Sequence, residues 1–277
     1  MKYAILAASL FASFATATVQ TAHAAEGGKF SLETGMDYNT GKYGGTQSTN
    51  MLYIPVTGKY QYQSWTLKLT VPYLRVTGPS TVINGIGMVS KLPGAAITTR
   101  SGLGDVIASA THTAYYDAAT GLLVNLTGKI KLGTADSAKG LGTGMNDYMF
   151  QSDIYQISGD LTTFGTIGYK IYGSPAGYAL NNILYGLLGA SYKLDQDTNG
   201  GMMLRLGQAS ITTGSSRMEA IFFVSRKLDK TWKAQGYVLK GFTNSVPDFG
   251  AGATIAYQFC MTSPAACAGL PAYIQES

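Results

Sequence analysis

One pattern of side chains constrains this chain more than any other. From residue 28 to residue 259, apolar and polar residues alternate in segments separated by clusters rich in Gly, Asn, Asp or Pro. Alternation with a period of two is typical of β-strands that have one apolar and one polar face. We therefore predict twelve strands, at residues 29–39, 50–62, 65–77, 102–116, 121–133, 146–158, 161–172, 181–194, 200–209, 216–228, 231–242 and 248–259.

The connections between these segments alternate in length. Short turns are expected at 63–64, 117–120, 158–160, 195–199 and 229–231, and longer loops at 40–49, 78–101, 134–145 and 173–180. Short turns at one rim and long loops at the other are typical of outer-membrane β-barrels, in which the short turns face the periplasm. The predicted fold is an all-β, twelve-stranded antiparallel transmembrane barrel of the bacterial outer membrane, formed by residues 25–259.

Composition excludes several other classes of protein. Charged residues make up only 13% of the chain, but the mean hydropathy of +0.07 is too low for a bundle of membrane helices, each of which needs about 20 apolar residues in a row. The aromatic share of 11% argues against intrinsic disorder. The net charge is +5, but the basic residues are scattered singly, so nucleic acid is not an expected partner.

The two faces of each predicted strand indicate which side meets lipid. In segment 121–133, Leu122, Val124 and Leu126 alternate with Asn125, Thr127, Lys129 and Lys131. A lysine facing hydrocarbon near the bilayer midplane costs about 2–4 kcal/mol, so the polar face must be the lumen. Near the strand ends we expect an aromatic girdle at the headgroup level. It comprises Tyr38, Tyr62, Trp65, Tyr73, Tyr116, Tyr148, Tyr192 and Trp232.

The same alternation predicts which charged residues line the pore. They are Glu33, Asp37, Lys59, Lys68, Asp105, Lys129, Lys131, Asp153, Lys170, Arg205, Arg217 and Glu219, with Asp147, Lys193 and Lys227 on the same side. Because both signs are mixed, these charges could form cross-strand ion pairs that rigidify the wall, or a selectivity filter. The sequence leaves both alternatives open.

The two ends of the chain do not belong to the predicted barrel. Residues 1–24 are typical of a secretory signal, with Lys2, an apolar core and an Ala22-His23-Ala24 cleavage site. Residues 260–277 are expected to form a periplasmic tail. Its two cysteines, Cys260 and Cys267, are the only ones in the chain and predict a small disulfide loop in an oxidising compartment.

No group of residues predicts an enzyme. After signal cleavage the only histidine is His112, which falls on the apolar face of its strand, away from Ser109 and Thr111. A hydrolase would need a histidine within hydrogen-bonding reach of its nucleophile. The glycine-rich run at 140–144 lacks the Lys-Ser/Thr pair of a phosphate loop. We predict no catalytic residue, cofactor or metal site.

The final segment alternates from Phe249 to Phe259, which is similar to the assembly signal of bacterial barrels, although a tail follows here. Several short motifs also follow one another in a fixed order. They are Tyr43-Gly44-Gly45, Tyr53-Ile54-Pro55-Val56, Trp65-Thr66-Leu67, residues 71–78, residues 101–106, residues 128–132, residues 140–144 with Asp147-Tyr148, and residues 247–250 through Tyr257-Gln258-Phe259. In their order and spacing these motifs resemble the outer-membrane transporter family named for the MetA pathway of phenol degradation.

The resemblance implies an outer-membrane channel for passive uptake of small hydrophobic or aromatic solutes, with a closed structural barrel as the alternative. Twelve strands predict a narrow or partly occluded lumen. The apolar segment 78–101 is expected to fold over or into the outer mouth and to act as an apolar gate for hydrophobic solutes. Expected partners are outer-membrane lipid and lipopolysaccharide, the barrel-insertion machinery and a small-molecule solute, with the protein acting as a monomer.

Overall fold

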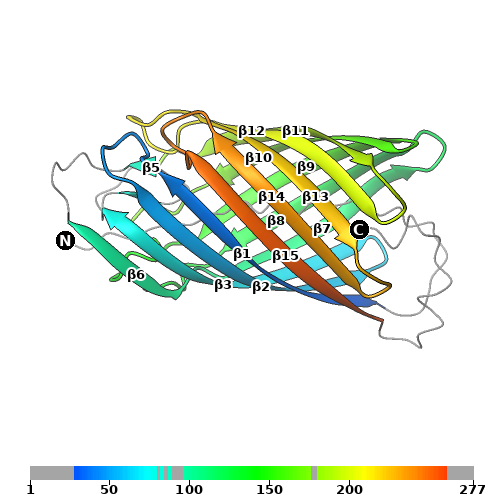
Figure 1. Ribbon diagram of the computed structural model, residues 1–277, viewed down its shortest axis with the longest axis horizontal. Helices are drawn as coiled ribbons and strands as arrows, with labels where there is room; N and C mark the ends of the chain where they lie inside the picture. The colour runs from blue at the N-terminus through cyan, green and yellow to red at the C-terminus, as the bar shows by residue number, and fades with distance from the viewer. Residues whose placement is uncertain (1–27, 80–81, 84–86, 89–95, 176–179, 261–277) are drawn as a thin grey trace.

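The computed structural model describes residues 28–79, 82–83, 87–88, 96–175 and 180–260 as a closed antiparallel barrel (Figure 1). The predicted signal at 1–24 lies outside these residues, and so does the predicted tail at 260–277 apart from Cys260, which is the last residue of β15 (Phe249–Cys260). Each strand of the wall pairs with its neighbours in chain order, and β1 pairs with β15 to close the barrel. The predicted fold class is confirmed. Among the described residues, no helix is long and apolar enough to span a bilayer.

The strand boundaries agree closely with the alternation in the sequence. The wall consists of β1 (Lys29–Gly41), β2 (Thr49–Tyr62), β3 (Trp65–Pro79), β6 (Ile97–Leu103), β7 (Ile107–Asp117), β8 (Leu122–Lys131), β9 (Asp147–Ser158), β10 (Leu161–Ile171), β11 (Ile183–Lys193), β12 (Thr198–Gly207), β13 (Arg217–Lys227), β14 (Trp232–Gly241) and β15 (Phe249–Cys260). A separate two-stranded sheet is formed by β4 (Val82–Ile83) and β5 (Gly87–Met88). In Figure 1, β5 and β6 lie at the end of the barrel opposite to the end of β15.

The prediction of a loop at 78–101 followed by one strand at 102–116 is wrong, because β6 already begins at Ile97 and a break separates it from β7. β6 pairs with the C-terminal half of β3, at Tyr73–Pro79, and β7 pairs with the N-terminal half of β3, at Trp65–Thr70. β6 and β7 therefore occupy one position in the wall, which leaves twelve positions around the barrel. In the break, the amide of Gly104 donates to the carbonyl of Pro72 at 2.8 Å. The break turns Asp105 toward the lumen, where it is buried.

The lipid-facing surface is apolar, as expected. Along β3, Trp65, Leu67, Leu69, Val71 and Tyr73 are all exposed on the outside. Such an exposed apolar band is what a transmembrane barrel presents to lipid.

Seven of the eight residues predicted for the aromatic girdle are exposed, and Tyr116 is not. The pairing of β7 with β8 shifts register between Thr113 and Tyr115, so that β7 contains one extra residue. Such a bulge reverses the faces of the residues that follow it. Tyr115 is therefore exposed on the outer surface, and Tyr116 is partly buried instead. The other seven predicted aromatic residues are exposed.

Two glycines in the short turns allow a matched test of local backbone strain. Gly121 and Gly159 have positive φ angles of 72° and 61°, a conformation that costs other residues about 1–2 kcal/mol. A Cβ at Gly121 would also clash with the carbonyl oxygen of Ile157, whereas at Gly159 nothing lies within 4 Å. Gly159→Ala is expected to lower the free energy of unfolding by about 1 kcal/mol, and Gly121→Ala by clearly more. Urea unfolding of the protein in detergent micelles measures both, and equal losses would contradict the expectation.

Candidate functional site

The lumen is the candidate site, because its wall carries the charged residues predicted from strand parity. All twelve predicted pore-lining residues lie on the inner side, and none of them is exposed. Asp105 reaches the lumen from the break before β7, and the others reach it from the strands. Their part in permeation stays a prediction. The structure brings several of them together in two ion-pair networks.

The first network joins four buried charges near the outer end of the barrel. Lys131 Nζ lies 3.0 Å from Asp105 Oδ2 and 3.7 Å from Asp147 Oδ2, and Lys170 Nζ lies 3.2 Å from the same Asp147 oxygen. Lys170 also lies over the ring of Tyr172, 4.0 Å from its centroid. Lys131, Lys170 and Asp147 are at most 1% exposed. Buried charges are tolerated only when each is compensated, so the two lysines and two aspartates form one interdependent unit.

This network holds the loop between β8 and β9 inside the barrel. The amide of Ala135 donates to Asp105 Oδ1 at 2.9 Å, and Lys131 Nζ donates to Thr143 Oγ1 at 3.2 Å. A Cβ on Gly142 would come within 2.8 Å of both Asp105 carboxylate oxygens, so only glycine fits at this close approach. The loop at 132–146 is therefore anchored at its start and near its end by the charges beneath it.

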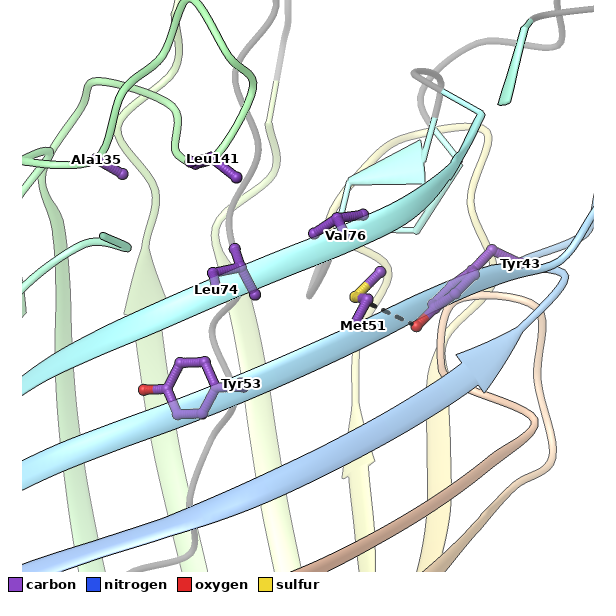
Figure 2. Close-up of a cluster of buried hydrophobic side chains, with 7 residues drawn as sticks. All are labelled: Tyr43, Met51, Tyr53, Leu74, Val76, Ala135 and Leu141. Atoms are coloured by element: carbon purple, nitrogen blue, oxygen red, sulfur yellow. Dashed lines mark hydrogen bonds between the residues drawn. The ribbon is translucent and has the colours of Figure 1, made fainter. Parts of the chain in front are cut away.

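The inward loop completes an apolar cluster within the outer part of the lumen. Tyr43, Met51, Tyr53, Leu74 and Val76 are buried there together with Ala135 and Leu141 of the loop. Figure 2 shows the two loop residues lying opposite the side chains of β2 and β3. The Tyr43 hydroxyl lies 3.9 Å from Met51 Sδ. The expectation of a polar interior is therefore wrong at the outer end, where the loop shields inward-facing apolar side chains from water. It is also wrong on β12 to β14, where Met203, Ile221, Phe223 and Leu239 are buried together.

The second ion-pair network lies on β12 and β13. Glu219 accepts from Arg205 Nη1 at 3.0 Å and from Arg217 Nη2 at 2.9 Å. Glu219 is 1% exposed, and each of its carboxylate oxygens is bound by one guanidinium. The positive and negative residues that the sequence places inside therefore form ion pairs on β12 and β13, which rigidify this part of the wall.

Two more carboxylates are held by neutral donors. Asp153 accepts from Gln151 Nε2 at 2.7 and 2.9 Å and from Thr166 Oγ1 at 2.6 Å. The Gln151 side chain in turn accepts from the Tyr185 hydroxyl at 3.0 Å. The Tyr237 hydroxyl donates to Asp37 in the same way. These neutral partners are not among the predicted pore-lining residues, although strand parity also places Tyr185 and Tyr237 on the inner face.

Three lysines form a row across neighbouring strands on the inner side of the wall. Lys59 of β2 is paired directly with Lys68 of β3, Lys68 is paired with Ser109 of β7, and Ser109 is paired with Lys129 of β8. All three lysine side chains are partly exposed. Among the described residues, neither Lys68 nor Lys129 has a carboxylate within 4.0 Å. We call Lys59, Lys68 and Lys129 the lysine row.

Two further expectations concern the segment at 78–101 and the face of the wall on which His112 lies. Half of the proposed gate at 78–101 lies outside the described residues, which include β4, β5 and the two ends of the segment. His112 contacts Trp65 on the outer face, with ring centroids 4.7 Å apart. Its strand partners are Trp65 and Leu126, both exposed to lipid. His112 therefore lies on the side of the wall opposite to Ser109.

Comparison with known proteins places the fold among outer-membrane barrels. No protein-family model matches the sequence, and no curated protein matches it. The COG4313 outer membrane channel from Pseudomonas putida F1 aligns with a TM-score of 0.66 at 13% identity, over 87% of this chain and 100% of that chain. The translocator domain of autotransporter NalP from Neisseria meningitidis aligns with a TM-score of 0.50 at 14% identity, over 83% and 88%. The chain therefore has the fold of outer-membrane β-barrel proteins.

Proposed function

We propose that the protein is a passive channel of the bacterial outer membrane for small hydrophobic or aromatic solutes. The observation that carries the proposal is the apolar cluster of Tyr43, Met51, Tyr53, Leu74 and Val76 inside the outer part of the lumen. A general porin has a polar interior that contains water. The resemblance to the MetA-pathway transporter family supports an aromatic solute.

The apolar cluster discriminates between solutes by their polarity. A hydrated or strongly polar solute must give up hydrogen bonds to pass it, at a cost of about 1–3 kcal/mol for each unreplaced bond. An aromatic or aliphatic solute gains about 25 cal/mol for each Å² of apolar surface removed from water. Small apolar molecules are therefore expected to cross this layer faster than sugars or amino acids of the same size.

Liposome swelling tests this proposal directly. Proteoliposomes containing the refolded barrel are expected to swell faster in benzyl alcohol or phenol than in a sugar of similar volume, relative to protein-free liposomes. The protein-free control matters because aromatic alcohols also cross lipid unaided. Equal swelling of proteoliposomes and protein-free liposomes in every solute would contradict the channel.

A closed structural barrel is the second candidate, and the outer layer of the lumen favours it. The loop at 132–146 covers apolar side chains that are almost fully buried, and the charges beneath it are paired. Planar-bilayer recordings distinguish the two functions. Discrete openings support the channel, and silence from a barrel shown to be folded supports the structural role.

A further inference from the structure

Five lysines lie on the inner face of the barrel near the short turns. Lys29 is the first residue of β1, Lys227 is the last of β13 and Lys233 is the second of β14. Lys59 and Lys68, which also belong to the lysine row, lie three residues from the ends of β2 and β3 nearest the turn between them. Each of the five is an even number of residues from a buried inner residue of its strand, and therefore shares its face. We call these five residues the basic patch.

The pairing of the strands makes the basic patch continuous. β13, β14, β15, β1, β2 and β3 are neighbours in this order around the barrel. Lys227 is paired directly with Lys233, and Lys59 is paired directly with Lys68. Between these two pairs, Lys233 is paired with the small residue Ala256 of β15. The patch therefore covers one side of the lumen at the end of the barrel that faces the periplasm in outer-membrane proteins.

One carboxylate accompanies the five lysines on the inner face. On the described part of these six strands, Glu33 is the only acidic residue of that face within four residues of the short-turn end. Asp37 and Glu219 lie eight residues beyond Lys29 and Lys227 on β1 and β13. Eight residues span about 20 Å along the axis of a barrel whose strands are tilted by about 40°. The patch is therefore positive on balance, and a lysine that donates hydrogen bonds to neutral groups keeps its charge.

The short turns next to the patch do not cancel its charge. The turn between β2 and β3, at 63–64, has no charged residue. In the turn between β13 and β14, Asp229 and Lys230 are both exposed, so this turn adds no net charge. Asp229 also accepts hydrogen bonds from the amides of Thr231 and Trp232 of its own turn, at 2.7 and 2.8 Å.

Water reaches the basic patch, in contrast to the ion network at the outer end. All five lysines of the patch are partly exposed, whereas Lys131 and Lys170 of the outer network are each 1% exposed. The outer level of the lumen is thus closely packed, and the level of the short turns is accessible to water and small ions.

We propose that the basic patch makes this end of the lumen a vestibule that attracts small anions and repels cations. A cleft with charges of one sign and low-dielectric walls raises the local concentration of ions of the opposite sign. Rings of lysine or arginine likewise give a pore its preference for anions. As a filter on permeation the inference rests on the proposed channel function, and it assigns a neutral or negative charge to the solute. The attraction itself does not require the outer end to be open.

Quenching of an introduced tryptophan by ions measures the local ion concentration without requiring transport. Gln61 of β2 is a partly exposed inner residue that is paired with Lys29 and lies two residues from Lys59. The fluorescence of Gln61→Trp, refolded in uncharged detergent, is titrated with iodide and with caesium. A potential of about one kT raises the local concentration of a univalent anion about threefold and lowers that of a cation about threefold. The ratio of iodide to caesium quenching is therefore expected to be about fivefold or more above that outside the lumen.

Two reference proteins define the ratio outside the lumen. The native protein gives the background from Trp65 and Trp232, which are exposed on the lipid-facing side. Ala118→Trp places the probe in the exposed turn between β7 and β8. Equal ratios at Gln61→Trp and Ala118→Trp would overturn the proposal. Gln235→Trp, on the inner face of β14, gives the same measurement if Gln61→Trp does not fold.

Charge variants that carry Gln61→Trp test the patch itself. Lys68→Gln and Lys233→Gln are each expected to lower the ratio about twofold, and Glu33→Gln is expected to raise it. A defect in folding would not move the ratio in opposite directions. The matched control is Lys230→Gln, which removes the same charge from an exposed turn and is expected to leave the ratio unchanged. If Lys230→Gln lowers the ratio as much as Lys233→Gln, only the net charge of the protein matters and the proposal is wrong.

Planar-bilayer recordings in a gradient of KCl show whether a failure concerns the vestibule or the channel. An open barrel is expected to give a reversal potential of the sign that chloride selectivity produces. If the barrel conducts without preferring chloride and the quenching ratios are equal, the inference is wrong and the channel function stands. If iodide is enriched at Gln61→Trp and the folded barrel is silent, the channel function is wrong and the vestibule stands. Circular dichroism of each variant establishes that the barrel has folded.

Discussion

Lys131→Met is expected to lower the free energy of unfolding by about 3–5 kcal/mol, the usual effect of removing one partner from a buried ion pair. Lys131 is the only cation within 4.0 Å of Asp105 among the described residues, and it also lies 3.7 Å from Asp147. Methionine has nearly the same length, so the change removes the charge and leaves no large cavity. The measurement is urea unfolding in detergent micelles, followed by tryptophan fluorescence.

The matched control is Lys139→Met, in the same loop. Lys139 pairs with Asp136 at 3.4 Å, but its side chain is 62% exposed, and surface pairs contribute at most about 1 kcal/mol. Adding Asp105→Asn to Lys131→Met is expected to restore part of the stability, because the uncompensated carboxylate disappears. If Lys131→Met and Lys139→Met have the same effect, the buried network does not stabilise the barrel.

Shortening the loop between β8 and β9 is expected to raise single-channel conductance severalfold. The variant lacks residues 135–143 and joins Thr134 to Gly144 through two glycines. Gly133 and Gly144 already lie against each other, so a short connection can span the gap. The deletion removes Ala135 and Leu141 from the apolar cluster and Thr143 from the ion network. Recordings in planar bilayers measure the effect.

A smaller change at one residue provides a graded comparison. Leu141 packs against Gly102 of β6, where a Cβ would lie 2.8 Å from Leu141 Cδ1. Leu141→Ser keeps the loop and its anchors but weakens the apolar contact, so its conductance is expected to lie between those of the native protein and the deletion. A folded deletion variant with native conductance would show that the loop at 132–146 does not restrict the lumen.

Alternation in the sequence determined the twelve positions of the wall and the face on which most residues lie. Lipid outside and a polar lumen inside impose a period of two on every strand, so that Lys129 and Lys131 could be placed inside from their neighbours alone. The same rule failed where the chain departs from a regular strand. The break at Asp105 and the extra residue before Tyr115 depend on pairing with β3 and β8, which a period within one segment does not contain.

Only the tertiary structure determined which charged side chains form ion pairs with one another. Parity placed Asp105, Lys131, Lys170 and Glu219 on the inside, but their partners depend on the stagger between neighbouring strands. The same stagger aligns Lys59, Lys68 and Lys129 in one row. The loop at 132–146 is rich in Gly and polar residues, as an exposed loop would be. It folds inward because Asp105 and Lys131, buried beneath it, bind Ala135 and Thr143.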